Sequence, residues 1–381
     1  MEQFAVINAS VVTDGEVFPG KCVVVENGVI KSVGQGIPEN IPTLDAAGNY
    51  LVPGYIDMHI HGTDGHLADS GTSALEALSL TLPHYGVTGF LACVTPKRDD
   101  TALLRELSQA RGEGAHILGF MLEGHYLKLT GAIPHVLNDY SPKRVKELLS
   151  AASPYSIAFA ISPEIQELEE LMPLFTSGGF PAFITHTCAS PEQTERFISL
   201  GALHATHFYD VFPYPVETEP GRRACGAVEA IMADRAVSVD FILDGEHVEP
   251  IAVKMAMACK GLDGVCLISD ANITAGLPPG VYRGLSDVEV SVGYIGGPAR
   301  MTDGGGLVGS GLTLDLAVRN AVKMLGLTFA QAVKLASENP ARVLGLGETK
   351  GRIAPGYDAD FTIQDRNLKV CSCFIKGRSV F

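Results

Sequence analysis

Histidine and carboxylate residues stand at the ends of several short apolar segments of this 381-residue sequence. They are His59, His61, Glu123, His186, His207 and Asp270. Imidazole nitrogens and carboxylate oxygens are common ligands of zinc and related divalent cations. A bound cation lowers the pKa of water toward neutrality and polarises a carbonyl group. The set therefore predicts metal-dependent hydrolysis, with Asp270 taking a proton from water and passing it to a leaving amine.

The pair His59 and His61 carries more weight than an isolated histidine. A single histidine is more often a satisfied core or surface residue than a metal ligand. Alternate residues of a strand point to the same face, so these two imidazoles can face one site. Four histidines and two carboxylates at the ends of different segments are hard to obtain by accident, which favours a metal site.

The elements that would position these residues alternate along the centre of the chain. The expected strands are YIDMHIH (55–61), TGFLACVT (88–95), ILGFMLEG (117–124), SIAFAIS (156–162), PAFITHT (181–187), ALHATHF (202–208), VSVDFIL (237–243) and GVCLISDA (264–271). Helix-like segments separate them, which indicates a parallel sheet covered on both faces. Eight such units predict an α/β fold, a closed (β/α)8 TIM-type barrel over residues 51–345, with its functional residues at the carboxyl ends of the strands.

The two ends of the chain have a different character from its centre. Residues 1–50 alternate apolar and polar positions around turn signals at Asp14-Gly15 and Asn27-Gly28, a pattern that is typical of short antiparallel strands. Residues 346–381 repeat this pattern. We therefore predict that both ends together build one small β-sandwich beside the barrel.

Composition and charge exclude several classes of protein. The formal net charge is −15, which argues against a nucleic-acid partner because phosphate backbones require clustered Lys and Arg. The first residues do not read as a signal peptide, and no apolar run reaches the ~18 residues of a membrane span. The eight cysteines are scattered. We expect a reduced, cytoplasmic protein without membrane contact.

Seven motifs together resemble those of one known family. They are PGYIDMHIHG (53–62), GFMLEGHYL (119–127), THTCAS (185–190), ATHFYD (205–210), LDGEHVEP (243–250), ISDANITAG (268–276) and GLVGSGLTLD (306–315). Over essentially its whole length the chain resembles the N-acetylglucosamine-6-phosphate deacetylases of the amidohydrolase superfamily. The resemblance implies hydrolysis of the N-acetyl group of a small amino-sugar substrate, with N-acetylglucosamine 6-phosphate as the first candidate.

The resemblance also implies roles for individual residues. Glu123, His186 and His207 look like the ligands of the main metal, and His59 and His61 imply a second ion that Glu123 would bridge. One or two divalent ions per subunit are therefore expected, with zinc as the first candidate and iron, manganese or others as alternatives. Asp270 matches the family's catalytic acid and base.

Further positions match residues that contact the substrate. His135 resembles a histidine that contacts the sugar. His247 matches a histidine that reaches the active site of the neighbouring subunit, which implies a homodimer.

The chain departs from the family in the segment that binds phosphate. Asp210 stands where the family has an asparagine that helps to hold phosphate, and Thr218 stands where it has a phosphate-binding arginine. A carboxylate gained and a guanidinium lost both oppose a dianion. Arg222 and Arg223 follow closely and are candidates to replace that arginine, although a solvated loop explains them equally well.

Three other readings remain open. A cyclic amidohydrolase would need a carboxylated lysine at the end of strand four, and this segment ends in Ser162-Pro163-Glu164 without one. Deacetylation of another N-acyl substrate, such as an unphosphorylated amino sugar, fits the changes at Asp210 and Thr218. A binding protein without catalysis would leave the complete set of ligands unexplained.

Overall fold

The computed structural model describes residues 3–132, 139–284, 288–304 and 306–381. His135 lies outside these ranges. No helix in the described part of the chain combines the length and the apolar character that crossing a membrane requires.

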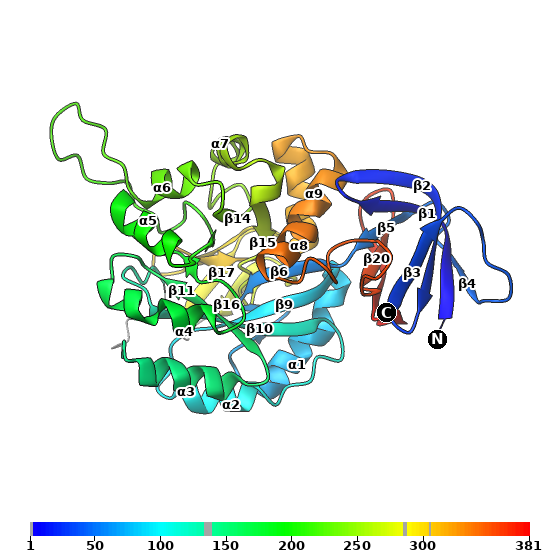
Figure 1. The fold of residues 1–381 in the computed structure, drawn as a ribbon, viewed down its shortest axis with the longest axis horizontal. Helices are drawn as coiled ribbons and strands as arrows, with labels where there is room; N and C mark the ends of the chain where they lie inside the picture. The colour runs from blue at the N-terminus through cyan, green and yellow to red at the C-terminus, as the bar shows by residue number, and fades with distance from the viewer. Residues whose placement is uncertain (1–2, 133–138, 285–287, 305) are drawn as a thin grey trace.

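A parallel sheet of eight strands forms the centre of the molecule (Figure 1). In sheet order the strands are β6 (Tyr55–Ile60), β9 (Val87–Val94), β10 (His116–Tyr126), β11 (Ser156–Ile161), β12 (Phe183–Ile184), β13 (His204–Ala205), β14 (Ser238–Ile242) and β15 (Val265–Ile268). A parallel bridge between Ile60 and Ala271 joins the last strand to the first. All eight expected strands are confirmed, and they form the expected barrel.

Helices follow most of these strands and pack on the outside of the barrel. They are α1 (Thr72–Thr81), α2 (Asp100–Leu107), α3 (Pro142–Ala152), α4 (Met172–Thr176), α5 (Pro191–Ser199), α6 (Ala227–Ala233), α7 (Pro250–Lys260), α8 (Leu314–Asn320), α9 (Phe329–Ala336) and α10 (Glu338–Val343). Their starts follow from sequence. The Ser190 hydroxyl caps α5 by accepting a hydrogen bond from the Gln193 backbone N–H. The Gln193 side chain in turn accepts one from the Ser190 backbone N–H, which completes a capping box.

The two ends of the chain share one sheet beside the barrel, at the right of Figure 1. Its strand order is β22 (Arg378–Ser379), β21 (Val370–Ile375), β20 (Phe361–Gln364), β5 (Tyr50–Pro53), β1 (Gln3–Thr13), β2 (Glu16–Glu26) and β3 (Val29–Gly34), and β4 (Thr43–Asp45) pairs with β1. The sheet packs around a core of its own that includes Phe4, Phe361 and Phe374. The boundary expected after residue 50 falls inside this sheet, because β5 pairs with β20.

An antiparallel sheet between β15 and α8 was not expected from the sequence. Its strands are β16 (Gly280–Arg283), β17 (Glu289–Val292), β18 (Pro298–Met301) and β19 (Leu307–Ser310), and a short pair, β7 (Gly62–Thr63) with β8 (His66–Leu67), follows the first barrel strand. The Ser310 N–H donates to the Asp270 carbonyl at 2.8 Å. Gly309 has a φ of 58°, and a Cβ there would meet the same carbonyl at 2.7 Å. Glycine therefore lets β19 lie directly against the end of the last barrel strand.

Candidate active site

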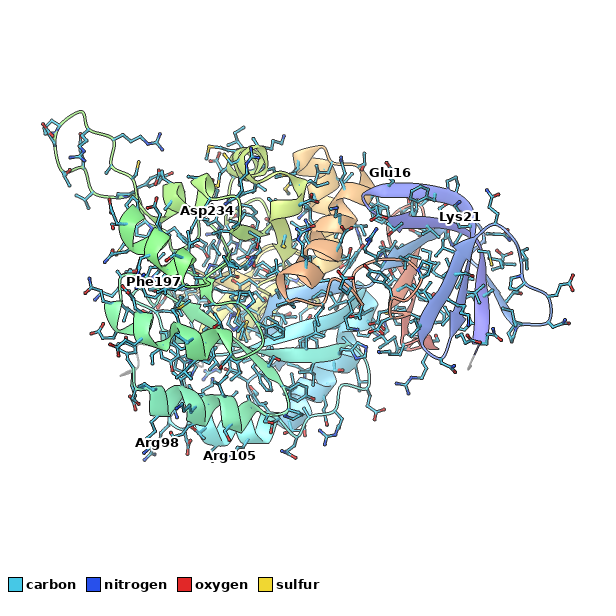
Figure 2. The ribbon with its side chains drawn as sticks, viewed as in Figure 1. Glu16, Lys21, Arg98, Arg105, Phe197 and Asp234 are labelled. Atoms are coloured by element: carbon cyan, nitrogen blue, oxygen red, sulfur yellow. The ribbon has the colours of Figure 1, made fainter. Side chains whose placement is uncertain are left out.

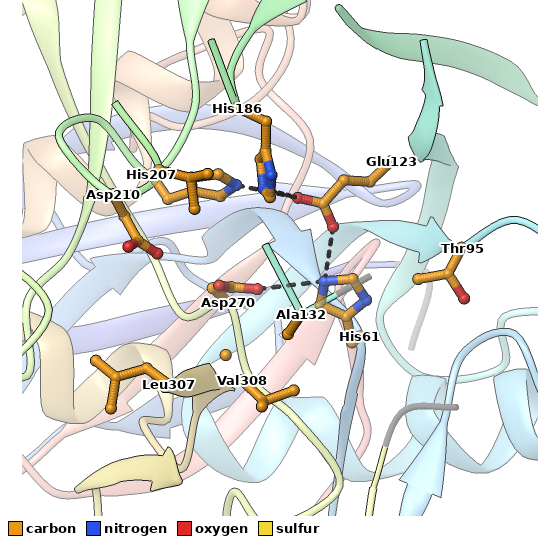
Figure 3. A pocket seen from close by; sticks show the side chains of 12 residues that line it. His61, Thr95, Glu123, Ala132, His186, His207, Asp210, Asp270, Leu307 and Val308 are labelled. Atoms are coloured by element: carbon orange, nitrogen blue, oxygen red, sulfur yellow. Dashed lines mark hydrogen bonds and ion pairs between the residues drawn. The ribbon is translucent and has the colours of Figure 1, made fainter. Parts of the chain in front are cut away.

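The barrel brings the six predicted metal-site side chains together at the carboxyl ends of its strands. His59 and His61 come from the end of β6, Glu123 from β10, His186 from the end of β12, His207 from the end of β13 and Asp270 from the end of β15. Figure 3 shows five of them, all but His59, converging on one cavity. All six are buried. The sequence predicted this grouping from strand ends alone.

The Glu123 carboxylate lies between two pairs of histidines, and Figure 3 draws three of them, His61, His186 and His207. Its Oε1 lies 3.0 Å from His207 Nε2 and 3.4 Å from His186 Nε2. Its Oε2 lies 3.0 Å from His61 Nε2 and 3.4 Å from His59 Nε2. One oxygen thus faces each histidine pair, which is the arrangement in which a carboxylate can be shared by two cations.

Asp270 closes the His59 and His61 side of this group. Its Oδ1 lies 3.3 Å from His61 Nε2 and 3.5 Å from His59 Nε2. The Asp270 backbone N–H donates to the His59 carbonyl at 2.9 Å, so the seam that closes the barrel also fixes this side chain. No hydrogen bond reaches its Oδ1, although that atom is buried.

Left-handed backbone turns aim several of these side chains into the mouth of the barrel. The φ angles are 49° at His186, 32° at His207 and 43° at Asp270. Residues with side chains rarely adopt this region, and such strain concentrates at functional sites. Hydrogen bonds also orient the rings: His186 Nδ1 lies 2.8 Å from the Leu129 carbonyl. A carbonyl only accepts, so Nδ1 carries a proton, and Nε2 is the ring nitrogen that faces Glu123.

The charged groups of the site shift one another's pKa values, so that Glu123 is held ionised and two histidines are held protonated. Burial opposes ionisation of Glu123, but the charge of His59 and hydrogen bonds from His186 and His207 hold its pKa well below the usual range. Burial likewise opposes protonation of His61, yet the adjacent carboxylates of Asp270 and Glu123 raise its pKa to about 10. His207 also has a pKa raised to about 10, against its burial, through Glu123. A cluster that attracts positive charge this strongly suits a cation.

The donor set fits a divalent metal. His59, Glu123 and His207 offer ligand atoms that all lie within 4.8 Å of one another. His59 Nε2 and Asp270 Oδ1 are buried without a hydrogen-bond partner, and such atoms are rare in proteins unless an ion or water satisfies them.

Cys93 lies in the same neighbourhood as His59 and His61. The sequence analysis took it for a small apolar residue, because nothing in a buried strand distinguishes the two roles.

The chain is similar in sequence to a known enzyme family. Residues 244–380 match the Amidohydrolase family. An N-acetylgalactosamine-6-phosphate deacetylase of Escherichia coli is 31% identical over 93% of both chains. An N-acetylglucosamine-6-phosphate deacetylase of Lysinibacillus sphaericus is 30% identical over 93% of this chain and 91% of its own.

The chain belongs to the amino-sugar-phosphate deacetylase family of amidohydrolases. Solved structures agree with this. The N-acetylglucosamine-6-phosphate deacetylase of Thermotoga maritima matches with a TM-score of 0.83 at 29% identity, over 99% of both chains. That of Mycobacterium smegmatis matches with a TM-score of 0.88 at 26% identity, over all of both chains. The chain is thus a hydrolase that acts on a linear amide bond.

As in any deacetylase, the reacting groups need a cavity for the substrate, and one lies directly in front of the metal-site cluster. It is lined by His61, Thr95, Glu123, Ala132, His186, His207, Asp210, Val211, Asp270, Leu307, Val308 and Gly309. Three of these come from β19, so the unexpected sheet supplies part of the wall. Thr95 also escaped the sequence analysis; its hydroxyl donates to Asp69 at 2.7 Å. The sequence does not reveal that these residues line the cavity, because they come together only when the barrel folds.

The predicted substrate-contacting residues divide into two groups. Asp210 lines the cavity, as expected of a substrate contact. His247 is held by Asp244, whose Oδ2 lies 2.7 Å from its Nδ1. Burial opposes protonation of His247, but Asp244 and then the charges of Asp210 and Asp270 raise its pKa. His247 does not line this cavity in its own chain, and the expectation that it reaches the active site of the neighbouring subunit stays a prediction.

Arg222 and Arg223 do not line the cavity of their own chain. They lie on residues 213–226, here called the arm, which stands clear of the barrel in Figure 2. The Arg223 side chain is 83% exposed and pairs with Glu229 at 3.1 Å. Their proposed role in place of the phosphate-binding arginine therefore stays a prediction. Among the cavity-lining residues there is no Lys or Arg.

Proposed function

We propose that this protein uses a divalent metal to hydrolyse the N-acetyl group of an amino sugar, releasing acetate and the free amine. The observation that carries the proposal is the Glu123 carboxylate between two histidine pairs, with Asp270 at the edge of the same cavity. The named relatives act on 6-phosphates of N-acetylgalactosamine and N-acetylglucosamine. N-acetylglucosamine 6-phosphate is therefore the first candidate substrate.

The proposed metal ligands follow from the two sides of Glu123. Glu123, His186 and His207 would hold the main ion, and His59 and His61 would share Glu123 with a second. Zinc is the first candidate because imidazole and carboxylate suit it, and iron or manganese are alternatives. When bound, the metal would polarise the acyl carbonyl and lower the pKa of water.

Asp270 is the proposed general base and acid. Burial opposes its ionisation, but the charge of His59 and the adjacent His61 ring lower its pKa, so it is a carboxylate at neutral pH. Its Oδ1 has no hydrogen-bond partner and it lines the cavity. The carboxylate would take a proton from the attacking water and deliver it to the sugar nitrogen as the amide bond breaks.

Acetate release tests this function. Metal-reconstituted protein is given N-acetylglucosamine 6-phosphate and N-acetylgalactosamine 6-phosphate in parallel, and free acetate is measured over time. We expect release from at least one of the two, and none after a chelator has removed the metal. Absence of acetate from both sugars and from their unphosphorylated forms would overturn the proposal.

A second candidate substrate is an unphosphorylated N-acetyl amino sugar. Asp210 favours it, because this carboxylate lines a cavity that has no Lys or Arg side chain in its lining. A carboxylate accepts hydrogen bonds from sugar hydroxyls but repels a phosphate dianion. Comparing kcat/KM for the free and phosphorylated sugars in wild type and Asp210→Asn decides between the candidates. A preference for the free sugar that Asp210→Asn reverses supports the second candidate.

We also propose a cytoplasmic homodimer. Tyr214 and Val216 of the arm and Ile251 and Met255 of α7 are large apolar side chains that stand exposed, and exposed apolar patches commonly mark protein interfaces. All eight cysteines are free, which suits a reducing compartment. Light scattering after gel filtration should give twice the chain mass, and Ile251→Glu with Met255→Glu should give the single-chain mass. A wild-type monomer would contradict the dimer.

A further inference from the structure

A chain of buried hydrogen bonds runs behind the metal-site histidines. His204 Nε2 lies 2.8 Å from Asp240 Oδ2, and the Thr206 hydroxyl donates to Asp240 Oδ1 at 3.2 Å. Thr206 Oγ1 in turn lies 2.9 Å from His59 Nδ1. All four residues are completely buried, and none of them is among the residues that line the cavity.

The direction of these hydrogen bonds follows from the chemistry of their members. A carboxylate only accepts, so the single Thr206 proton points toward Asp240. The Thr206 oxygen is then left to accept from His59, and His59 Nδ1 must carry a proton. In the neutral ring the Nε2 atom then keeps its lone pair, and this atom faces Glu123 and Asp270 at 3.4 and 3.5 Å. Asp240 thus selects the His59 tautomer that can bind a metal.

The same carboxylate oxygen also holds the other side of the site. Asp240 Oδ1 accepts a hydrogen bond from the His207 backbone N–H at 2.5 Å. That residue has a φ of 32°, in the left-handed region that side chains disfavour. One oxygen of Asp240 therefore touches both halves of the proposed metal site, the ring of His59 through Thr206 and the strained backbone of His207 directly.

His204 completes the arrangement at its far end. Its Nδ1 lies 2.7 Å from the Ser238 hydroxyl, so both ring nitrogens have partners. The ring can donate to Asp240 and compensate its buried charge. A buried pair of this kind is rarely favourable for stability alone, compared with apolar residues of the same size. This argues for a role of the pair in the site rather than in the core.

We propose that Asp240, acting through Thr206, is a positioning residue that sets the tautomer of His59 and thereby the affinity for the ion on the His59 and His61 side. The inference rests on the proposed metal site but not on the identity of the sugar. Its test therefore measures metal binding, so that a wrong substrate assignment leaves the result intact.

The decisive variant is Thr206→Val, which keeps the volume of the side chain and removes the hydroxyl. Metal-free protein is titrated with zinc against a chromophoric chelator, and both ions are followed. We expect one ion to bind about 10- to 100-fold more weakly, the usual effect of losing a partner behind a metal ligand. Thr206→Ser keeps the hydroxyl and should restore wild-type affinity.

Thr194→Val is the matched control, because Thr194 is equally buried but its hydroxyl serves only the Ser190 carbonyl of α5. Melting temperatures are measured with and without zinc. A merely structural role of Thr206 would lower both values alike, as in the control. A positioning role reduces the increase that zinc produces, and this is what we expect for Thr206→Val.

Asp240→Asn tests the carboxylate separately. We expect it to weaken the same ion as Thr206→Val does, because a neutral amide holds the Thr206 proton less firmly. If Thr206→Val does not fold, Thr206→Ala replaces it. The proposal is overturned if the hydroxyl-free variant binds both ions as tightly as Thr194→Val, or if Asp240→Asn leaves zinc affinity at the wild-type value.

Discussion

The two carboxylates of the site, Glu123 and Asp270, differ in how many histidines surround them. Both oxygens of Glu123 lie within 3.4 Å of histidine nitrogens, two histidines to each oxygen. Asp270 meets only His59 and His61, and through Oδ1 alone. Environments that separate two carboxylates in this way commonly assign them separate roles. This difference supports the proposed roles of Glu123 as a metal ligand and of Asp270 as the proton carrier.

Asp270→Asn should separate proton transfer from metal binding. The amide keeps the shape of the side chain but cannot take up a proton, so we expect kcat to fall by about 10²- to 10⁴-fold, the usual contribution of a general acid or base. Metal content, measured by elemental analysis, should stay near that of the wild type. Near-normal turnover in this variant would show that another residue carries the proton.

His186→Ala and His207→Ala should lose the main ion, because each removes one of three proposed ligands. His59→Ala should lose only the second ion, since its ring lies on the other side of Glu123. Metal-to-protein ratios on the three purified variants check this. Equal losses in all three would mean that the two sides of Glu123 bind their ions as one unit.

At the scale of elements, the barrel depends on its connection to the terminal sheet. The chain passes from β5 to β6 at Gly54, where a Cβ would meet the Thr88 hydroxyl at 2.0 Å. The C-terminal strands return to β5 through β20, which carries the segment around Asp360. Lys350 reaches this segment and pairs with Asp358 at 2.8 Å and Asp360 at 2.5 Å. A partly buried cation thus ties the end of the barrel to the sheet.

Lys350→Met should destabilise the protein by about 3–5 kcal/mol near neutral pH, because it removes a partly buried partner from two carboxylates, of which Asp360 is buried. Burial opposes ionisation of Asp360, but His116 and Lys350 hold its pKa well below the usual range. A lowered folded-state pKa contributes stability that is present above the unfolded value of about 3.9 and is lost as the pH falls below it. The difference between wild type and variant should therefore shrink below about pH 4.

Denaturant unfolding at several pH values measures this effect, and Lys376→Met is its matched control. Lys376 pairs with Asp358 at the same 2.8 Å, but its side chain is 46% exposed. An exposed pair contributes at most about 1 kcal/mol. Equal effects of the two substitutions would show that burial of Lys350 does not matter.

At the scale of the whole molecule, the site exists only because the barrel closes. Strands β6 and β15 are far apart in sequence, and the Ile60 to Ala271 bridge places His59 and Asp270 side by side. The antiparallel sheet that contains β19 then covers part of the mouth and adds Leu307 and Val308 to the cavity wall. The complete fold must therefore bring together the proposed ligands from four strands, β6, β10, β12 and β13, before a metal can bind.

Metal removal should consequently lower the stability of the whole protein. A ligand that binds only the folded state stabilises it by about 2.7 kcal/mol at 100 times its Kd. We expect a chelator to lower the melting temperature and added zinc to restore it. His207→Ala, without the main site, should respond little to either. A wild-type melting temperature that ignores both treatments would contradict a metal bound by this cluster.

The sequence by itself determined the barrel strands, the shared sheet of the two ends and the six residues of the metal-site cluster. Runs of apolar residues and turn signals are local properties, and the carboxyl ends of barrel strands always meet at one mouth. The positions of His59, His61, Glu123, His186, His207 and Asp270 could thus be inferred without coordinates. Their individual roles remain predictions.

Only the tertiary structure decided which residues surround that cluster. Short strands such as β16 and β19 leave too weak a pattern to be recognised, and nothing local tells the buried Cys93 or Asp240 apart from ordinary core residues. The same holds for the arm, whose arginines follow the expected phosphate segment in sequence but stand away from the cavity. Contacts of this kind depend on how distant strands are packed, and sequence spacing does not record that packing.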